Sequence, residues 1–206
     1  MSDTAHLDTE AVSAWLSQRM AGFQGPVRAE KFDGGQSNPT FRLITPSKDF
    51  VLRRKPPGLL LKSAHAVDRE FRVQKALEHS DVPVARMHVL CEDDAVIGSA
   101  FYVMDMVDGI NYDNPALPEV AQDDRRAIQE EMNRVLAAIH DVDIEAAQLS
   151  DFGPDGNYYQ RQISRWAKQY KASETEHIPD MDALIQWLDN NLPDDDGQRT
   201  LVHGDY

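Results

Sequence analysis

Residues 31–54 read KFDGGQSNPTFRLITPSKDFVLRR, and their pattern predicts the central sheet of the protein. It contains three short runs of strand-forming residues, at Lys31–Phe32, Thr40–Ile44 and Phe50–Arg53. Glycine, serine, asparagine and proline separate the first two runs, and Thr-Pro-Ser-Lys-Asp separates the second from the third, which are turn compositions. Short strands joined by short turns pair with their neighbours in sequence, so the stretch predicts an antiparallel meander.

The sequence on either side of this meander predicts helices and further strands. Apolar residues recur at helical spacing over residues 8–20 and again from about residue 66 to 79. Two more strands are predicted over residues 84–90 and 100–107, on either side of an acidic turn. The result is an antiparallel sheet with one helix inserted after its third strand.

Beyond residue 108 the apolar pattern changes from strand to helix. Helical spacing continues over residues 123–140 and then around residues 163–170 and 181–188. This change predicts an α+β protein of two lobes, with residues 1–108 forming a sheet lobe and residues 109–206 forming part of a mainly helical lobe.

The composition limits the possible partners and compartments. The chain has 206 residues and a formal net charge of −14, which disfavours nucleic acids and anionic membranes as ligands. Residues 1–10 have no apolar run that would serve as a signal peptide, and no stretch is long and apolar enough to span a bilayer. With Cys91 as the single cysteine, no internal disulfide is possible. These features predict a soluble cytoplasmic protein.

Three stretches resemble the aminoglycoside/choline phosphotransferase family, which has the protein-kinase-like fold. They are residues 32–41, residues 51–58 and the terminal LVHGDY at 201–206. The runs RRKPPG at 53–58 and AHAVDRE at 64–70 further resemble the branch found alone in bacteria or fused to acyl-CoA dehydrogenase domains. The resemblance implies ATP-dependent phosphorylation of a hydroxyl group on a small molecule. It also implies that the sheet lobe of residues 1–108 binds the nucleotide.

A glycine-rich turn is the first candidate phosphate site. Gly34 and Gly35 lie between the first two strands, where the lack of side chains lets backbone N–H groups approach a phosphate. Ser37 and Asn38 would add side-chain donors. Taken alone, the same residues also fit an ordinary hairpin turn, and the family resemblance is what favours the phosphate site.

A basic island follows this turn. Residues 50–67 contain four basic residues and no acidic one, in an otherwise acidic chain. By resemblance, Arg53 at the end of the third strand binds the α- and β-phosphates of ATP and pairs with Glu70 on the next helix. The wider fold usually has lysine there, although the planar fork of arginine suits phosphate oxygens. The alternative is an exposed basic turn with Glu70 as a solvated helix residue.

The position of the last predicted strand suggests where the adenine would bind. In the fold that the chain resembles, this strand runs into a hinge whose backbone reads the adenine edge. The resemblance therefore assigns Asp105, Met106 and Val107 to nucleotide binding. The sequence itself indicates only a buried strand.

The resemblance makes Asp205 the catalytic residue. Its carboxylate follows a short strand predicted at residues 200–202, and it would orient the acceptor hydroxyl and take its proton. His203 would hold the loop in place. The alternative is that His-Gly-Asp is simply a polar turn.

The metal ligands of the family are expected beyond Tyr206. The family continues to an asparagine and a later aspartate that hold Mg²⁺, so we expect no metal ligand within this chain and little kinase activity from the chain alone. The acceptor would be a hydroxylated acyl or acyl-CoA compound, or an aminoglycoside-like one. The alternatives are a module that binds ATP without transferring phosphate, and a pure interaction domain.

Overall fold

The computed structural model describes residues 7–32, 38–56, 66–112, 114–154, 156–195 and 197–206. The chain divides into two compact units, residues 1–142 together with 202–206, and residues 143–201. In chain order the elements are α1 (Thr9–Arg19), β1 (Arg28–Lys31), β2 (Thr40–Ile44), β3 (Phe50–Arg54), α2 (Val67–Leu77), β4 (Met87–Cys91), α3 (Asp94–Ile97), β5 (Phe101–Asp105), α4 (Gln122–His140), α5 (Tyr158–Ser173) and α6 (Pro179–Asn190).

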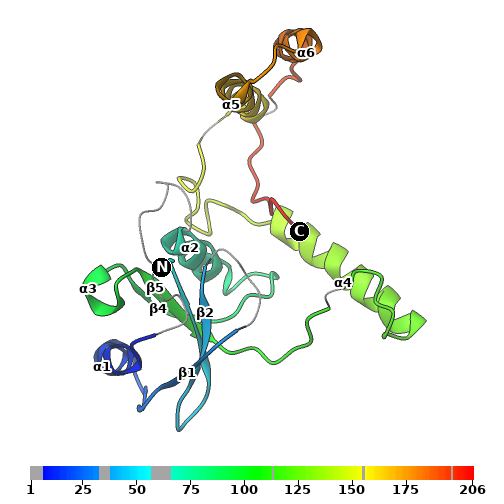
Figure 1. The fold of residues 1–206 in the computed structure, drawn as a ribbon. Coiled ribbons are helices and arrows are strands. Elements are labelled where there is room, and N and C mark those ends of the chain that lie inside the picture. The colour runs from blue at the N-terminus through cyan, green and yellow to red at the C-terminus, as the bar shows by residue number, and fades with distance from the viewer. Residues whose placement is uncertain (1–6, 33–37, 57–65, 113, 155, 196) are drawn as a thin grey trace. The chain divides into compact units, whose positions relative to one another are not determined.

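The first unit is built on an antiparallel sheet (Figure 1). Its strand order is β1-β2-β3-β5-β4. The first three strands form a meander, and α2 is inserted between β3 and β4. Arg53 on β3 pairs with Thr40 on β2 and with Tyr102 on β5. These observations confirm the predicted α+β class, the meander and the inserted helix.

The sheet separates two apolar clusters, because successive side chains of a strand point to opposite faces. On one face, Phe101 and Val103 of β5 pack with Val12 and Leu16 of α1. On the other face, Tyr102 and Met104 pack with Val67 and Phe71 of α2. Accordingly, α1 and α2 cover opposite faces of the sheet (Figure 1).

Helix α2 is amphipathic and is anchored at both ends. Val67 and Leu77 are buried, and Phe71 packs beside Tyr102 with the ring centroids 6.1 Å apart. Asp68 and Glu70 lie in its first turn, where negative charge is favoured by the helix dipole. This placement brings the carboxylate of Glu70 next to the sheet.

The second unit consists mainly of α5 and α6. The two helices pack together, and Lys171 of α5 forms an ion pair with Asp182 of α6. Lys171 also pairs with Glu174, at 3.4 Å. None of the helices in the described parts of the chain is long and apolar enough to cross a membrane.

The ends of several strands differ from the sequence prediction. β1 was predicted at Lys31–Phe32, but it runs from Arg28 to Lys31. β4 begins at Met87 instead of residue 84. β5 ends at Asp105, two residues before the predicted end. The physical reason is that pairing decides where a strand ends: the ladder between β4 and β5 runs only from Met87↔Met104 to Cys91↔Phe101.

Two local predictions were wrong. The acidic segment before β5 was predicted as a turn, but it contains the short helix α3, in which the Asp93 carboxylate accepts a hydrogen bond from the Ala95 N–H. Gly98 ends this helix with a φ of 82°, a conformation that glycine adopts at little cost. Residues 200–202 were predicted as a strand, but they form none, because they pair with no strand in the described residues.

Candidate functional site

The carboxylate of Glu70 is the centre of a hydrogen-bonded cluster on the α2 face of the sheet. Its Oε2 accepts from Arg53 Nε at 2.8 Å and from the Tyr102 hydroxyl at 3.1 Å. Its Oε1 accepts from Asn38 Nδ2 at 2.8 Å. We call Asn38, Arg53, Glu70 and Tyr102 the Glu70 cluster. It joins a loop, two strands and a helix at one carboxylate.

The register of the sheet explains why these side chains meet. Arg53 and Tyr102 are directly paired across β3 and β5, so their side chains lie on the same face. Thr40 is paired with Arg53 from the other side, and its hydroxyl accepts from Arg53 Nη1 at 3.3 Å. Since α2 packs on this face, Glu70 reaches the same position. The predicted pairing of Arg53 with Glu70 is therefore present.

Burial and charge distinguish this pair from a surface ion pair. The side chains of Arg53 and Glu70 are 33% and 32% exposed, so both are partly withdrawn from water but still reachable by a ligand. Tyr102 is 1% exposed. Its burial, together with the negative charge of Glu70, raises the pKa of Tyr102 to about 12, so its hydroxyl stays protonated and donates at neutral pH.

Arg53 keeps donor capacity beyond the Glu70 cluster. Its Nε and Nη1 donate to Glu70 and Thr40, whereas its Nη2 has no hydrogen-bond partner among the residues that the structure describes. The neighbouring Arg54 points to the opposite face, where it is 7% exposed and donates to the Ser99 hydroxyl and the Ile97 carbonyl. Burial lowers the pKa of Arg54. Of these two arginines, only Arg53 is placed to bind an anion on the α2 face.

Asn38 is the part of the predicted phosphate turn that the structure describes. Gly34, Gly35 and Ser37 lie outside the described residues. Asn38 is 4% exposed, and its side-chain amide donates to Glu70. The structure thus places this amide on the carboxylate, although the sequence suggested a role as a phosphate donor.

The side chain of Asp105 lies on the face opposite to the Glu70 cluster. It is paired with Phe50, whose side chain belongs to the apolar cluster of α1. Its Oδ1 accepts from Lys48 Nζ at 2.7 Å and lies 2.6 Å from His88 Nε2. Its backbone N–H donates to the Arg86 carbonyl. Neither the carboxylate nor the N–H of Asp105 therefore faces the Glu70 cluster.

The Asp105 carboxylate should contribute pH-dependent stability. Burial opposes its charge, but the hydrogen bonds from Lys48 and His88 outweigh burial and hold the pKa of Asp105 below its usual value. A depressed pKa stabilises the folded state above the unfolded pKa of about 3.9, and this contribution is lost as the pH falls through the folded pKa. We expect Asp105→Asn to lower the free energy of unfolding by about 1–2 kcal/mol at neutral pH.

Urea unfolding at pH 7, 5 and 3 checks this expectation. The deficit of Asp105→Asn relative to the wild type should begin to shrink at the lowest pH, because the Asp105 carboxylate starts to gain a proton as the pH falls towards its depressed folded pKa. Asp189→Asn, on the exposed surface of α6, serves as the control and should change little. An equal deficit at pH 3 and pH 7 would contradict the role given to the charge.

The other two hinge candidates follow the end of β5. Met106 is half-buried, and Val107 is 65% exposed. Both lie outside any regular element, as a hinge segment requires. Their contact with a nucleotide base remains a prediction.

Asp205 lies in an exposed turn at the C-terminus. Its backbone N–H donates to His203 Nδ1 at 3.2 Å, and the His203 ring packs against that of Tyr206 with the centroids 5.5 Å apart. The Tyr206 hydroxyl in turn donates to the Met132 carbonyl of α4 at 2.5 Å. These contacts agree with His203 holding the loop. The catalytic role of Asp205 remains a prediction.

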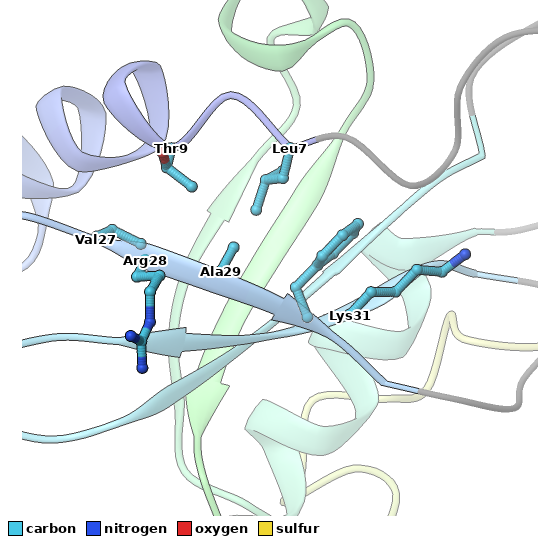
Figure 2. A pocket seen from close by; sticks show the side chains of 7 residues that line it. Leu7, Thr9, Val27, Arg28, Ala29 and Lys31 are labelled. Atoms are coloured by element: carbon cyan, nitrogen blue, oxygen red, sulfur yellow. The ribbon is translucent and has the colours of Figure 1, made fainter.

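A cavity of about 320 Å³ lies elsewhere, between the start of α1 and the edge strand β1 (Figure 2). Its lining includes Leu7, Thr9, Arg28 and Lys31, and none of the predicted site residues belongs to it. It is therefore separate from the Glu70 cluster.

Sequence reasoning missed two members of the site, Tyr102 and Thr40. Both are cross-strand partners of Arg53. The signal that would have identified them is the pairing register, because partners on neighbouring strands share a face. The predicted strands contained both residues, but the prediction did not align one strand against the next.

Known structures have the same fold. A Ralstonia eutropha protein named as an aminoglycoside phosphotransferase matches with a TM-score of 0.83 and 51% identity, over 98% of this chain and 59% of that one. The GDP complex of aminoglycoside 2'-phosphotransferase-IIIa matches with a TM-score of 0.58 over 90% of this chain and 59% of that one, and its 14% identity shows the fold alone.

A mouse protein, acyl-CoA dehydrogenase family member 10, is 49% identical over 182 residues. The match covers 88% of this chain but only 17% of that relative, so the chain corresponds to a small part of a much longer protein there. It confirms the resemblance to the branch associated with acyl-CoA dehydrogenases. The family model described as "Phosphotransferase enzyme family" matches residues 28–206, which include the whole sheet and the Glu70 cluster. The chain belongs to this phosphotransferase family.

Proposed function

We propose that the chain binds ATP and takes part in transferring its terminal phosphoryl group to a hydroxyl of a small molecule. The observation that carries this proposal is the Arg53–Glu70 ion pair, at 2.8 Å, on one face of the sheet of a phosphotransferase fold. Phosphoryl transfer needs little covalent chemistry from a protein, which mainly holds the phosphates and aligns the acceptor. A positioned cation beside the sheet meets the first of these needs.

Arg53 binds the α- and β-phosphate oxygens in this proposal. Glu70 and Thr40 hold the guanidinium through its Nε and Nη1. The remaining Nη2 edge is then presented to the phosphates, and hydrogen bonds between arginine and phosphate are stronger than those between neutral groups. Glu70 balances the charge of Arg53 when no nucleotide is bound.

The base and the phosphate tail would contact neighbouring segments of the lobe of residues 1–108. Gly34, Gly35 and Ser37 would offer donors to the phosphates. The backbone of Met106 and Val107, with the carbonyl of Asp105, would border the base, because the Asp105 N–H is already bonded to Arg86.

Asp205 is the proposed general base. Its carboxylate would accept the proton of the acceptor hydroxyl, while His203 holds the turn by accepting the Asp205 N–H. Mg²⁺ would accompany ATP and neutralise phosphate charge. The described residues contain no group of three or more side chains placed to hold a metal, so they do not form a metal cage by themselves.

The acceptor is proposed to be a hydroxylated acyl or acyl-CoA compound. This choice is supported by the 49% identity to a relative named as an acyl-CoA dehydrogenase family member. An aminoglycoside-like acceptor is the second candidate, supported by the name of the Ralstonia relative. We propose a cytoplasmic location, where ATP is abundant.

Protection of the fold by ATP tests the proposal. A ligand at a hundred times its dissociation constant stabilises the protein by about 2.7 kcal/mol, which raises the melting temperature of a chain of this size by several degrees. We expect ATP, with or without Mg²⁺, to produce such a shift, and Arg53→Ala to reduce it strongly.

The same assay separates the competing functions. A shift together with phosphate transfer to a hydroxylated acyl-CoA supports the kinase. If the protein as the cell produces it shows the shift but transfers phosphate to no hydroxyl compound, the result supports a module that only binds ATP. The absence of any shift at millimolar ATP would contradict nucleotide binding and favour an interaction domain.

A further inference from the structure

We propose that Tyr102 and Asn38 are positioning residues, which fix the Glu70 carboxylate so that Glu70 in turn aims the Arg53 guanidinium at a phosphate. This inference rests on the proposed function and assigns roles to two side chains that would not themselves touch the nucleotide. It is carried by the four side chains of the Glu70 cluster and their distances.

The two carboxylate oxygens are held by different donors. Arg53 contacts Oε2 through its Nε, at 2.8 Å. An arginine held through one nitrogen leaves the carboxylate free to rotate, since the terminal torsion of glutamate is soft. Asn38 on Oε1 and Tyr102 on Oε2 remove this freedom, because together with Arg53 they fix the plane of the carboxylate.

The Tyr102 hydroxyl is itself directed towards the carboxylate. Gln74 Nε2 lies 3.4 Å from this oxygen, and the same amide donates to the Glu70 carbonyl at 3.3 Å. An amide N–H on the phenol oxygen leaves the phenol proton to point at Glu70. The hydroxyl therefore belongs to a chain of hydrogen bonds with one direction, from Gln74 through Tyr102 to Glu70.

Packing alone does not require the hydroxyl. The ring of Tyr102 packs with Val67, Phe71 and Met104, and phenylalanine would fill the same space. At 1% exposure, a hydroxyl without a partner would be costly. The hydrogen bond from the Tyr102 hydroxyl to Glu70 explains why a polar group is tolerated at this buried position. Removing the hydroxyl leaves Glu70 with two other donors.

The substitution Tyr102→Phe is the direct test. We expect it to weaken the binding of ATP and ADP about three- to tenfold by calorimetry, the size of typical couplings between contacting residues. Binding of adenosine should not change, because the Glu70 cluster acts only on the phosphates. Tyr112→Phe, which removes an exposed hydroxyl elsewhere in the same unit, should leave all three affinities unchanged.

A second background separates positioning from a merely structural role. In a Glu70→Ala chain, Tyr102→Phe should have little further effect on ATP affinity, because Tyr102 then has no carboxylate to position. An equal loss of ATP affinity in both backgrounds would overturn the inference, as would an equal loss for adenosine. Asn38→Ala should show the same dependence on Glu70.

Arg53→Ala distinguishes failure of this inference from failure of the proposed function. If Arg53→Ala weakens ATP binding but Tyr102→Phe and Asn38→Ala do not, only the positioning roles are wrong. If Arg53→Ala leaves ATP affinity unchanged, or if the wild type binds no ATP, the proposed function fails and the positioning roles fail with it.

Discussion

Glu70→Ala is expected to weaken ATP binding about 10- to 100-fold and to destabilise the first unit by about 2 kcal/mol. The substitution leaves Arg53, Asn38 and Tyr102 without their shared acceptor. Breaking a fully buried ion pair costs roughly 3–5 kcal/mol, and the partial exposure of this pair, 33% and 32%, reduces that figure. Calorimetric titration with ATP and urea unfolding measure the two effects separately.

A matched control is available on α4. Arg126 and Glu130 form an ion pair at 2.8 Å with side chains that are 82% and 65% exposed, so Glu130→Ala should change stability by no more than about 0.5 kcal/mol. Nucleotide affinity should not change in this control. Glu70→Ala with normal stability and normal ATP affinity would show that the Glu70 cluster has no part in binding.

Asp205→Asn is expected to lower the rate of phosphoryl transfer about 10²- to 10⁴-fold, while ATP affinity stays within about twofold. Asparagine has nearly the same size and can still bond to a hydroxyl, but it cannot accept the hydroxyl proton. The measurement is kcat for phosphate transfer, made on the protein as the cell produces it. The large loss should appear in kcat and not in the KM for ATP.

Two further variants make this result specific. Asp194→Asn, at an exposed position, should leave kcat unchanged. His203→Ala should lower kcat less than Asp205→Asn, because His203 acts through the Asp205 backbone N–H. Normal turnover in Asp205→Asn would remove Asp205 from the mechanism and leave His-Gly-Asp as a polar turn.

The sequence predicted the parts of the site that depend on local pattern. Strand-forming runs separated by turns predicted the meander, and helical spacing predicted α2. The family resemblance then paired Arg53 with Glu70, and the structure has this ion pair. Long, periodic elements and their order can be predicted because each is specified by its own residues.

The remaining features depend on register and pairing, which local pattern does not specify. The role of Tyr102 follows from its alignment with Arg53 across β3 and β5. The direction of the Asp105 side chain follows from strand alternation, because Tyr102 and Asp105 are three positions apart and so lie on opposite faces. A shift of one residue would have exchanged these two faces.

The Glu70 cluster is built entirely from contacts between distant parts of the chain. Its hydrogen bonds join residues 17 positions apart for Arg53 and 32 positions apart for both Asn38 and Tyr102. Contacts of this kind form late and slowly in folding, because closing the loops costs entropy before the contacts repay it. A folding intermediate that has its helices but not its paired strands would lack the Glu70 cluster. Binding of a nucleotide to the cluster would therefore indicate that the strands of the sheet have paired.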